Sequence, residues 1–245
     1  PHEEFSVARF QRAADEAFDD IVGRGAHGLL VGGTGLYHQA VIDDLALPGR
    51  FPQVLATLEA EAVDEDCLRS MHGRLASLDP VAAERMEPTN RRRVLRALEV
   101  TLGAGRPFSS FGPGLDAHPP TPFVQVGLRL ERAVTAGRIA ERFDAMIDAG
   151  LLDEVRALVE LPGGLSRTAS QALGYRELAE HLNGERTLTD AVSAAVQRTQ
   201  QLAVRQERWF RRDPRLVWVD AEADAATVAD RVQAAWATAG AWEPT

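Results

Sequence analysis

The chain has 245 residues, 45% of them hydrophobic and 26% charged, which excludes a disordered chain and predicts either one large globular domain or a core with a smaller insertion. Its one cysteine, Cys67, excludes a disulfide framework and a thiolate zinc cluster, and it favours a reducing, cytoplasmic location. No segment approaches the roughly 20 apolar residues that span a bilayer, and the N-terminus lacks a signal-peptide pattern, so we expect no membrane association.

The formal net charge of -9 argues against a protein that coats nucleic acid, although net charge averages over local patches. All 27 basic residues are arginine. The absence of lysine excludes, within these residues, a Schiff-base lysine and the lysine of a G-x-x-x-x-G-K-[ST] phosphate loop. The chain begins at Pro1 with what reads as the approach to a helix, and we expect a piece of a longer protein.

The first 47 residues predict an α/β core segment. Apolar residues spaced three and four apart predict an amphipathic helix over residues 5–22. The apolar run at 28–31 predicts a buried parallel strand, and it leads through a glycine loop into a second helix from 36 to about 45. This order of elements is typical of a parallel-sheet domain.

The rest of the chain predicts a helical insertion and a return to the core. Residues 48–100 are polar and helical in pattern, without a strand, and residues 101–122 are rich in glycine and proline, which predicts an irregular connection. Residues 123–245 are expected to complete the core. The elements predicted there are a strand at 123–128, helices at 131–149, 151–160, 168–182 and 187–212, a strand at 216–219 and a helix at 224–238.

The glycine loop Gly32-Gly33-Thr34-Gly35 follows the first predicted strand and opens a helix, which is where open α/β sheets bind ligands. Its glycines allow a ligand to approach the backbone, and the Thr34 hydroxyl can donate and accept hydrogen bonds. The alternative is a tight turn in which Thr34 only caps the helix. The spacing alone favours neither interpretation.

Arginines gather in two segments. Residues 85–96 hold five arginines against one glutamate, and residues 198–215 hold six against two acidic residues, a local surplus of +4 in each. Guanidinium groups pair with phosphate, and Trp209 and Phe210 beside the second cluster could stack on unpaired bases, so the two clusters favour RNA binding. The alternative is a solvated helix face with ion pairs along the helix.

The histidines show no metal-ligand spacing such as H-E-x-x-H, and no G-x-S-x-G occurs, so a metalloprotease or a serine hydrolase has no support. Seven strings spread over the chain instead form one pattern. They are FSVARF at 5–10, LVGGTGLY at 30–37, LDPVAA at 78–83, RRVLRALEV at 92–100, AGLLDEV at 149–155, LGYR at 173–176 and RQERWF at 205–210. In this order they resemble the tRNA dimethylallyltransferase family.

The resemblance implies a P-loop kinase-like α/β core, incomplete at the N-terminus, with a helical insertion that grips the anticodon arm of tRNA and a helix-rich C-terminal part. It implies transfer of a dimethylallyl group from dimethylallyl diphosphate to the exocyclic amine of the adenine 3′ of the anticodon. Mg²⁺ assists departure of the diphosphate, and the base is flipped out to be reached. We expect a monomer.

The resemblance also implies site residues. It places Thr34 beside the tRNA, with Gly32, Gly33 and Gly35 in the loop near the substrate. The further residues that it implies in tRNA binding are Arg92, Arg93, Arg96, Gly174, Tyr175, Arg176, Arg205, Gln206, Arg208 and Trp209.

The family's G-K-[ST] phosphate loop and its catalytic aspartate lie before the part that matches Pro1. We therefore expect no catalytic residue and no metal ligand in this chain, and no activity of the chain by itself. The family string T-R-x-x-A-K-R-Q is TQQLAVRQ at 199–206, which lacks two cations and predicts weaker RNA binding. Two alternatives stay open: a non-catalytic RNA-binding module derived from that family and, less favoured, a fragment of a small-molecule kinase.

Overall fold

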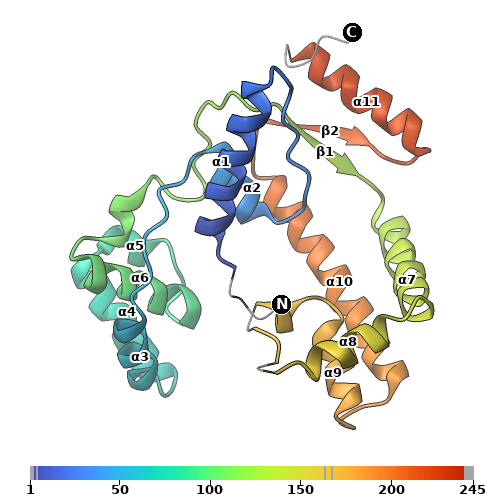
Figure 1. Ribbon diagram of the computed structural model, residues 1–245. Coiled ribbons are helices and arrows are strands. Elements are labelled where there is room, and N and C mark those ends of the chain that lie inside the picture. The colour runs from blue at the N-terminus through green and yellow to red at the C-terminus, as the bar shows by residue number, and fades with distance from the viewer. Residues whose placement is uncertain (1–2, 4, 163, 167, 240–245) are drawn as a thin grey trace. The chain divides into compact units, whose positions relative to one another are not determined.

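The computed structural model describes residues 3, 5–162, 164–166 and 168–239, and the fold is mostly helical with a small parallel sheet (Figure 1). The chain divides into two compact units. Unit 1 combines Pro1–Asp43 with His118–Thr245, and unit 2 is Asp44–Ala117. Unit 2 therefore contains all of residues 48–100, the stretch expected as an insertion, and most of the connection expected at 101–122. Within the described ranges, no helix is both long and apolar enough to cross a membrane.

Unit 1 carries the sheet and most of the helices. The side chains of Ser6, Thr187 and Asp224 cap three of these helices by accepting hydrogen bonds from backbone N–H groups of the first turn, as short polar side chains do at helix starts. Its elements are α1 (Val7–Gly23), α2 (Gly35–Ile42), β1 (Gln125–Arg129), α7 (Arg132–Asp148), α8 (Leu151–Val159), the 3₁₀ turn η2 (Ala169–Gln171), α9 (Tyr175–Leu182), α10 (Leu188–Phe210), β2 (Leu216–Asp220) and α11 (Ala225–Thr238).

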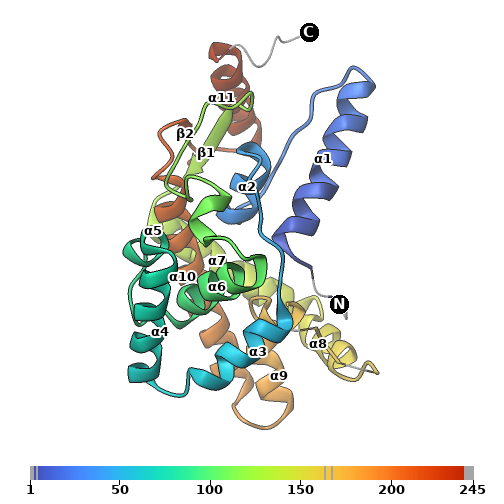
Figure 2. The same ribbon diagram turned by 90° about the vertical axis from the view of Figure 1, so that its left-hand side faces the viewer.

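The sheet consists of β1 and β2, paired in parallel from Gln125 opposite Leu216 to Arg129 opposite Asp220. Parallel neighbours require a crossover connection, and α7 to α10 provide it. Helix α11 packs against the sheet beside β2 (Figures 1 and 2). The two strands and the parallel pairing confirm the expectation for this half of the chain.

The strand predicted at residues 28–31 is wrong. These residues belong to no helix or strand, and Leu29 and Val31 are 63% and 81% exposed. A strand is stabilised by hydrogen bonds to a neighbour, and in the described sheet β1 and β2 pair only with each other. Residues 28–31 are apolar, but no strand among the described residues pairs with them.

The helical part of unit 1 packs around Phe143, Val155 and Leu178 from α7, α8 and α9. Gly174 precedes α9 with a φ of +89°, and a Cβ there would lie 2.9 Å from the Phe143 ring. Only glycine fits both conditions. The predicted helix over 168–182 is therefore wrong in its first part: η2 comes first, and the α-helix begins at Tyr175.

Unit 2 is helical, as its sequence pattern predicts, around a core that includes Leu58, Leu75 and Leu98. The buried Asp79 carboxylate accepts hydrogen bonds from Ala82 N at 3.0 Å and from Ser109 N and Oγ, both at 2.7 Å. Burial opposes its ionisation, but these bonds lower the pKa of Asp79. The elements are α3 (Pro52–Glu61), α4 (Glu65–Leu78), α5 (Pro80–Glu84), α6 (Arg91–Ala104) and η1 (Phe108–Phe111). The start of the predicted irregular connection is thus partly helical and is tied to Asp79.

Candidate nucleic-acid interface

The glycine loop lies directly against the C-terminal half of α10. A Cβ on Gly33 would lie 2.5 Å from Nε2 of Gln206, and one on Gly35 would lie 2.2 Å from Cδ1 of Trp209. Glycine is required at position 35 because the Trp209 ring occupies the space that a Cβ needs, whereas a Cβ at position 33 would displace only the flexible end of the Gln206 side chain. The fold brings together two motifs that are far apart in the sequence.

Thr34 stands exposed at the N-cap position of α2. Its backbone has φ -87° and ψ 92°, yet its side chain accepts no hydrogen bond from the first turn of the helix. Because a capping threonine would bond the N–H two or three residues on, the structure does not support a purely capping role. The hydroxyl lies on the surface beside Gly33 and Gly35, where a ligand can reach it.

A group of ionised side chains holds α2 in place. Arg215 donates from Nη1 to Oδ1 of Asp43 at 2.7 Å and from Nη2 to Oδ2 of Asp213 at 2.7 Å. It also donates to the carbonyl oxygen of Pro119. Burial opposes ionisation of Asp213, but the hydrogen bonds and charge of Arg215 lower its pKa to about 2. The Arg215 network, Arg215 with Asp43 and Asp213, thus joins the end of α2 to the start of β2.

His38 lies on α2 close to this network. Its ring meets the Phe210 ring edge to face at a centroid distance of 5.6 Å. Burial lowers the pKa of His38, and the negative charges of Asp213 and Asp43 oppose that shift only in part. Because Phe210 neighbours Trp209, the neutral ring of His38 supports the contact between the glycine loop and α10.

The second arginine cluster separates into engaged and exposed members. Arg215 is internal to unit 1, and Arg211 forms an ion pair with Glu207 on α10. Arg205 and Arg208 are exposed, and the structure gives neither an ion pair among the described residues. At the end of the helix the Arg212 guanidinium lies 4.8 Å from the Trp209 ring centroid. These exposed guanidinium groups, with Gln206 and Trp209 at the loop, form the cationic side of the candidate site.

The first cluster lies in unit 2, at the N-terminus of α6. Arg96 donates to Glu99 and to the carbonyl oxygen of Pro48, both at 2.8 Å, so its guanidinium holds the segment before α3. Arg92 and Arg93 are exposed in the first turn. Cations there face the positive end of the helix dipole, which is unfavourable in the free protein and favours binding of an anion.

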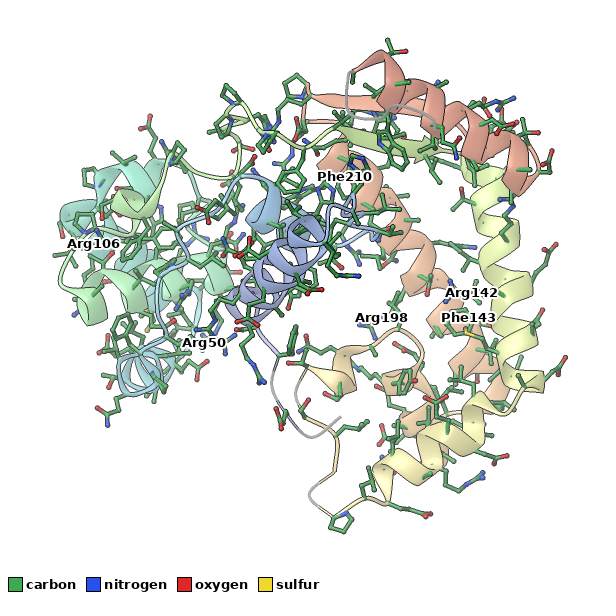
Figure 3. The ribbon with its side chains drawn as sticks, turned by 45° about the horizontal axis from the view of Figure 1, so that its top comes forward. Arg50, Arg106, Arg142, Phe143, Arg198 and Phe210 are labelled. Carbon is green, nitrogen blue, oxygen red and sulfur yellow. The ribbon has the colours of Figure 1, made fainter. Side chains whose placement is uncertain are left out.

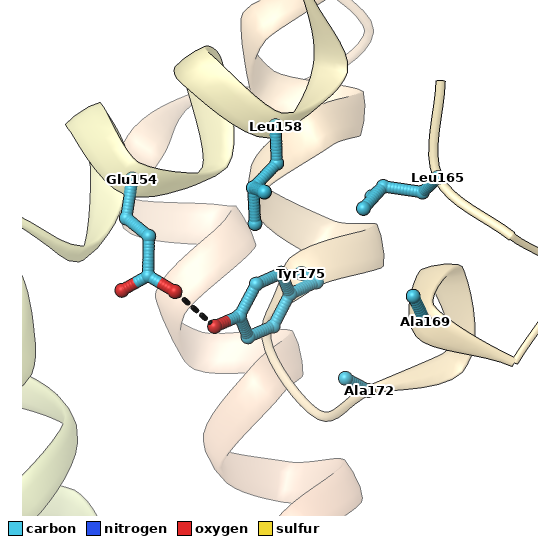
Figure 4. A pocket seen from close by; sticks show the side chains of 6 residues that line it. All are labelled: Glu154, Leu158, Leu165, Ala169, Ala172 and Tyr175. Atoms are coloured by element: carbon cyan, nitrogen blue, oxygen red, sulfur yellow. Dashed lines mark hydrogen bonds between the residues drawn. The ribbon is translucent and has the colours of Figure 1, made fainter. Parts of the chain in front are cut away.

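The Gly174-Tyr175-Arg176 motif has partners within unit 1. The Tyr175 hydroxyl donates to Oε1 of Glu154 at 2.5 Å, and this hydrogen bond raises the pKa of Tyr175. Arg176 forms an ion pair with Glu180 at 2.9 Å. The Tyr175 ring also faces a pocket of about 410 Å³ (Figure 4), which is lined by Glu154, Leu158, Leu165, Ala169, Ala172 and Tyr175.

The described residues contain no cluster of side chains that could coordinate a divalent metal ion. No group of three or more histidine, cysteine, aspartate or glutamate residues there could hold a metal ion. The described residues therefore do not fit a Mg²⁺ site.

Comparisons with known proteins decide the family. The family model "IPP transferase" matches residues 1–213. The chain belongs to this family. It is 43% identical over 222 residues to the tRNA dimethylallyltransferase of Desulforudis audaxviator, covering 91% of this chain and 72% of the relative. It is 46% identical over 218 residues to that of Thermobifida fusca, covering 89% and 67%. These matches confirm the resemblance, and the family is one of prenyltransferases.

Solved structures agree with the fold. The tRNA isopentenylpyrophosphate transferase of Bacillus halodurans matches with a TM-score of 0.64 and 33% identity, over 98% of this chain and 75% of that one. The Staphylococcus epidermidis transferase matches with a TM-score of 0.64 and 31% identity, over 97% of this chain and 78% of that one. A eukaryotic dimethylallyltransferase described as acting on tRNA reaches 0.73 at 23% identity, which supports the fold alone.

Sequence reasoning missed the Arg215 network. It grouped Arg215 with the arginine cluster at 198–215, and it assigned no role to Asp43. The sole local signal is the spacing Asp213-Pro214-Arg215, in which the aspartate also accepts from the N–H of Arg215 at 2.9 Å. Asp43 lies 172 residues away, so only the tertiary structure could reveal its role.

We expect Gly35→Ala to separate the glycine loop from α10. The added Cβ collides with the Trp209 ring and should lower the free energy of unfolding by about 1–3 kcal/mol, the usual range for overpacking. Gly32→Ala is the matched control, because a Cβ there meets nothing within 4 Å. Thermal and urea unfolding of both variants would measure the difference, and equal losses would contradict the packing argument.

Acidification should weaken the same region through His38. The pKa of His38 is lowered below 6.5 in the folded chain, so its stabilising contribution is complete above that value and is lost as the pH falls. We expect wild-type stability to fall more steeply than that of His38→Phe between about pH 7 and about pH 5. Urea unfolding at a series of pH values measures this, and parallel curves would show that His38 does not titrate as its burial requires.

Proposed function

We propose that this chain supplies the tRNA-binding surface of an enzyme that transfers a dimethylallyl group from dimethylallyl diphosphate to the exocyclic amine of the adenine 3′ of the anticodon. Membership of the family supports the reaction. The observation that carries the binding role is the packing of the glycine loop, which bears the exposed Thr34, on Gln206 and Trp209 of α10. Arg205 and Arg208, the sequence neighbours of Gln206 and Trp209, are also exposed. In this proposal the parallel sheet is part of a P-loop kinase-like core.

The loop and α10 act together on the RNA. The exocyclic amine of a stacked adenine is hidden, so the base has to leave the stack before it can react. Gly33 and Gly35 allow the loop backbone to lie close to α10. The Thr34 hydroxyl can donate a hydrogen bond to the edge of an extruded base or accept one from it. Arg205 and Arg208 bind phosphate groups beside that base. These residues bind and orient the acceptor, and we assign none of them as the base that removes the proton.

Unit 2 contributes a second phosphate-binding surface for the anticodon arm. Arg92 and Arg93 bind phosphate there, while Arg96 acts indirectly because it holds the segment at Pro48. Tyr175 and Arg176 are proposed tRNA contacts that exchange their bonds to Glu154 and Glu180 for the RNA. The single cysteine favours a cytoplasmic location, and the proposed state is a monomer.

The binding role predicts a defined loss in Arg205→Gln with Arg208→Gln. Two phosphate contacts disappear, so the slope of log affinity against log salt concentration should decrease by about 1.4, or about 0.7 for each contact to a single strand. Arg24→Gln with Arg231→Gln is the matched control, since it removes the same charge from exposed arginines paired with Asp20 and Asp220. Fluorescence titration of a labelled tRNA transcript measures both, and equal slopes would contradict the proposal.

Transfer activity separates the enzyme from a non-catalytic binding module. The 245 residues contain no lysine and hence no G-K-[ST] loop, so a polypeptide of these residues should bind tRNA without transferring the dimethylallyl group. Fusion to the G-K-[ST]-bearing N-terminal segment of a relative should restore incorporation of radiolabelled dimethylallyl diphosphate into tRNA. Turnover by the 245 residues alone would contradict the expectation, and a folded, tRNA-binding but inactive fusion would favour the binding module.

A further inference from the structure

A buried carboxylate on α9 holds an arginine of α10. The Glu177 side chain is 4% exposed, and its Oε1 accepts a hydrogen bond from Nη1 of Arg198. Its other oxygen, Oε2, is buried and finds no hydrogen-bond partner in the described part of the chain. Glu177 is therefore a buried anion whose one ion-pair partner in the described structure is Arg198.

A contribution to folding stability does not explain why this buried ion pair is present. Removing a carboxylate from water costs several kcal/mol, and the attraction of one guanidinium offsets that only when the remaining lone pairs are also satisfied. In this pair, Oε2 of Glu177 has no hydrogen-bond partner among the described residues. What the arrangement does achieve is orientation. Nη1 of Arg198 is fixed on Glu177, while the Arg198 side chain remains 37% exposed and its other N–H groups have no hydrogen-bond partner given among the described residues.

The position of Arg198 on α10 relates it to the exposed arginines. At 3.6 residues per turn, Arg198 and Arg205 point within about 20° of each other, and Arg208 lies about 80° away. Arg205 is about 10 Å further along the helix axis, so the two side chains can reach different phosphate groups. Glu207 and Arg211 lie on the other side of α10. Figure 3 shows Arg198 midway along the helix that ends at Phe210.

We propose that Arg198, oriented by Glu177, binds a phosphodiester group of the RNA backbone and extends the row formed by Arg205 and Arg208 toward the start of α10. This inference rests on the proposed tRNA-binding function and adds a residue and a direction to it. The RNA follows α10 away from the glycine loop. Glu177 is a positioning residue, because it acts through Arg198 and does not touch the RNA.

The test replaces both partners, Glu177→Gln with Arg198→Gln, in the full 245-residue chain. The two amides can still hydrogen-bond, and the formal net charge stays at -9 because one charge of each sign is removed. The matched control is Asp20→Asn with Arg24→Gln, which likewise removes one acidic residue and one arginine, from an exposed ion pair on α1. A labelled tRNA transcript is titrated with each protein between about 50 and about 200 mM salt.

The expected result is a salt slope about 0.7 smaller for the Glu177/Arg198 variant than for wild type. Over this fourfold range of salt, wild-type affinity then falls about 2.6-fold more than that of the variant. The control keeps the wild-type slope, and so does Arg198→Lys, which retains the charge. Melting curves confirm folding. Should the amide pair fail to fold, Glu177→Leu with Arg198→Met replaces the ion pair by apolar side chains of similar size.

Two outcomes overturn the inference, and they are distinguishable. If the Glu177/Arg198 variant is folded and keeps the full wild-type slope, Arg198 makes no phosphate contact, while the proposed tRNA-binding function stands. If the wild-type chain itself shows no salt-dependent binding of the transcript, the proposed function fails together with this inference.

Discussion

The buried ion pairs of Arg215 are the contact on which the candidate site depends. Asp43 ends α2, and Asp213 and Arg215 connect α10 to β2, so one guanidinium joins the helix after the glycine loop to the helix that the loop touches. The Asp43 carboxylate is 1% exposed, and such a group is stable as an anion only with a well-placed cation. The contacts of Gly33 and Gly35 with α10 follow from this position of α2.

The fold assigns different tasks to residues of one type. On an acidic chain without lysine, Arg96 and Arg215 bind carboxylates and carbonyl oxygens inside their units, whereas Arg92, Arg93 and Arg205 remain exposed. Internal arginines organise the segments that carry the exposed ones. Arg198 belongs to both groups, because it satisfies a buried glutamate and still reaches solvent. Local surplus charge alone therefore overstates the number of arginines that can meet RNA.

Gly35 of the loop and Gly174 are required for different structural reasons. Gly35 is needed because the Trp209 ring lies where a Cβ would be, and Gly33 lies against the end of the Gln206 side chain. Gly174 combines a left-handed backbone with close contact to Phe143, and it sets the start of α9. Each motif reflects a neighbour distant in the sequence. The family strings around these glycines therefore describe a packed arrangement.

The sequence by itself determined most helices, the two strands at 125–129 and 216–220, and the family, because local periodicity and motif order are properties of neighbouring residues. By resemblance it also implied a tRNA-binding role for the glycine loop and for the arginines of α10. Only the tertiary structure decided that residues 28–31 form no strand, that Arg215 pairs with Asp43, and that Glu177 holds Arg198. Strand pairing and buried ion pairs depend on partners distant in the chain, and no local pattern records which partner is present.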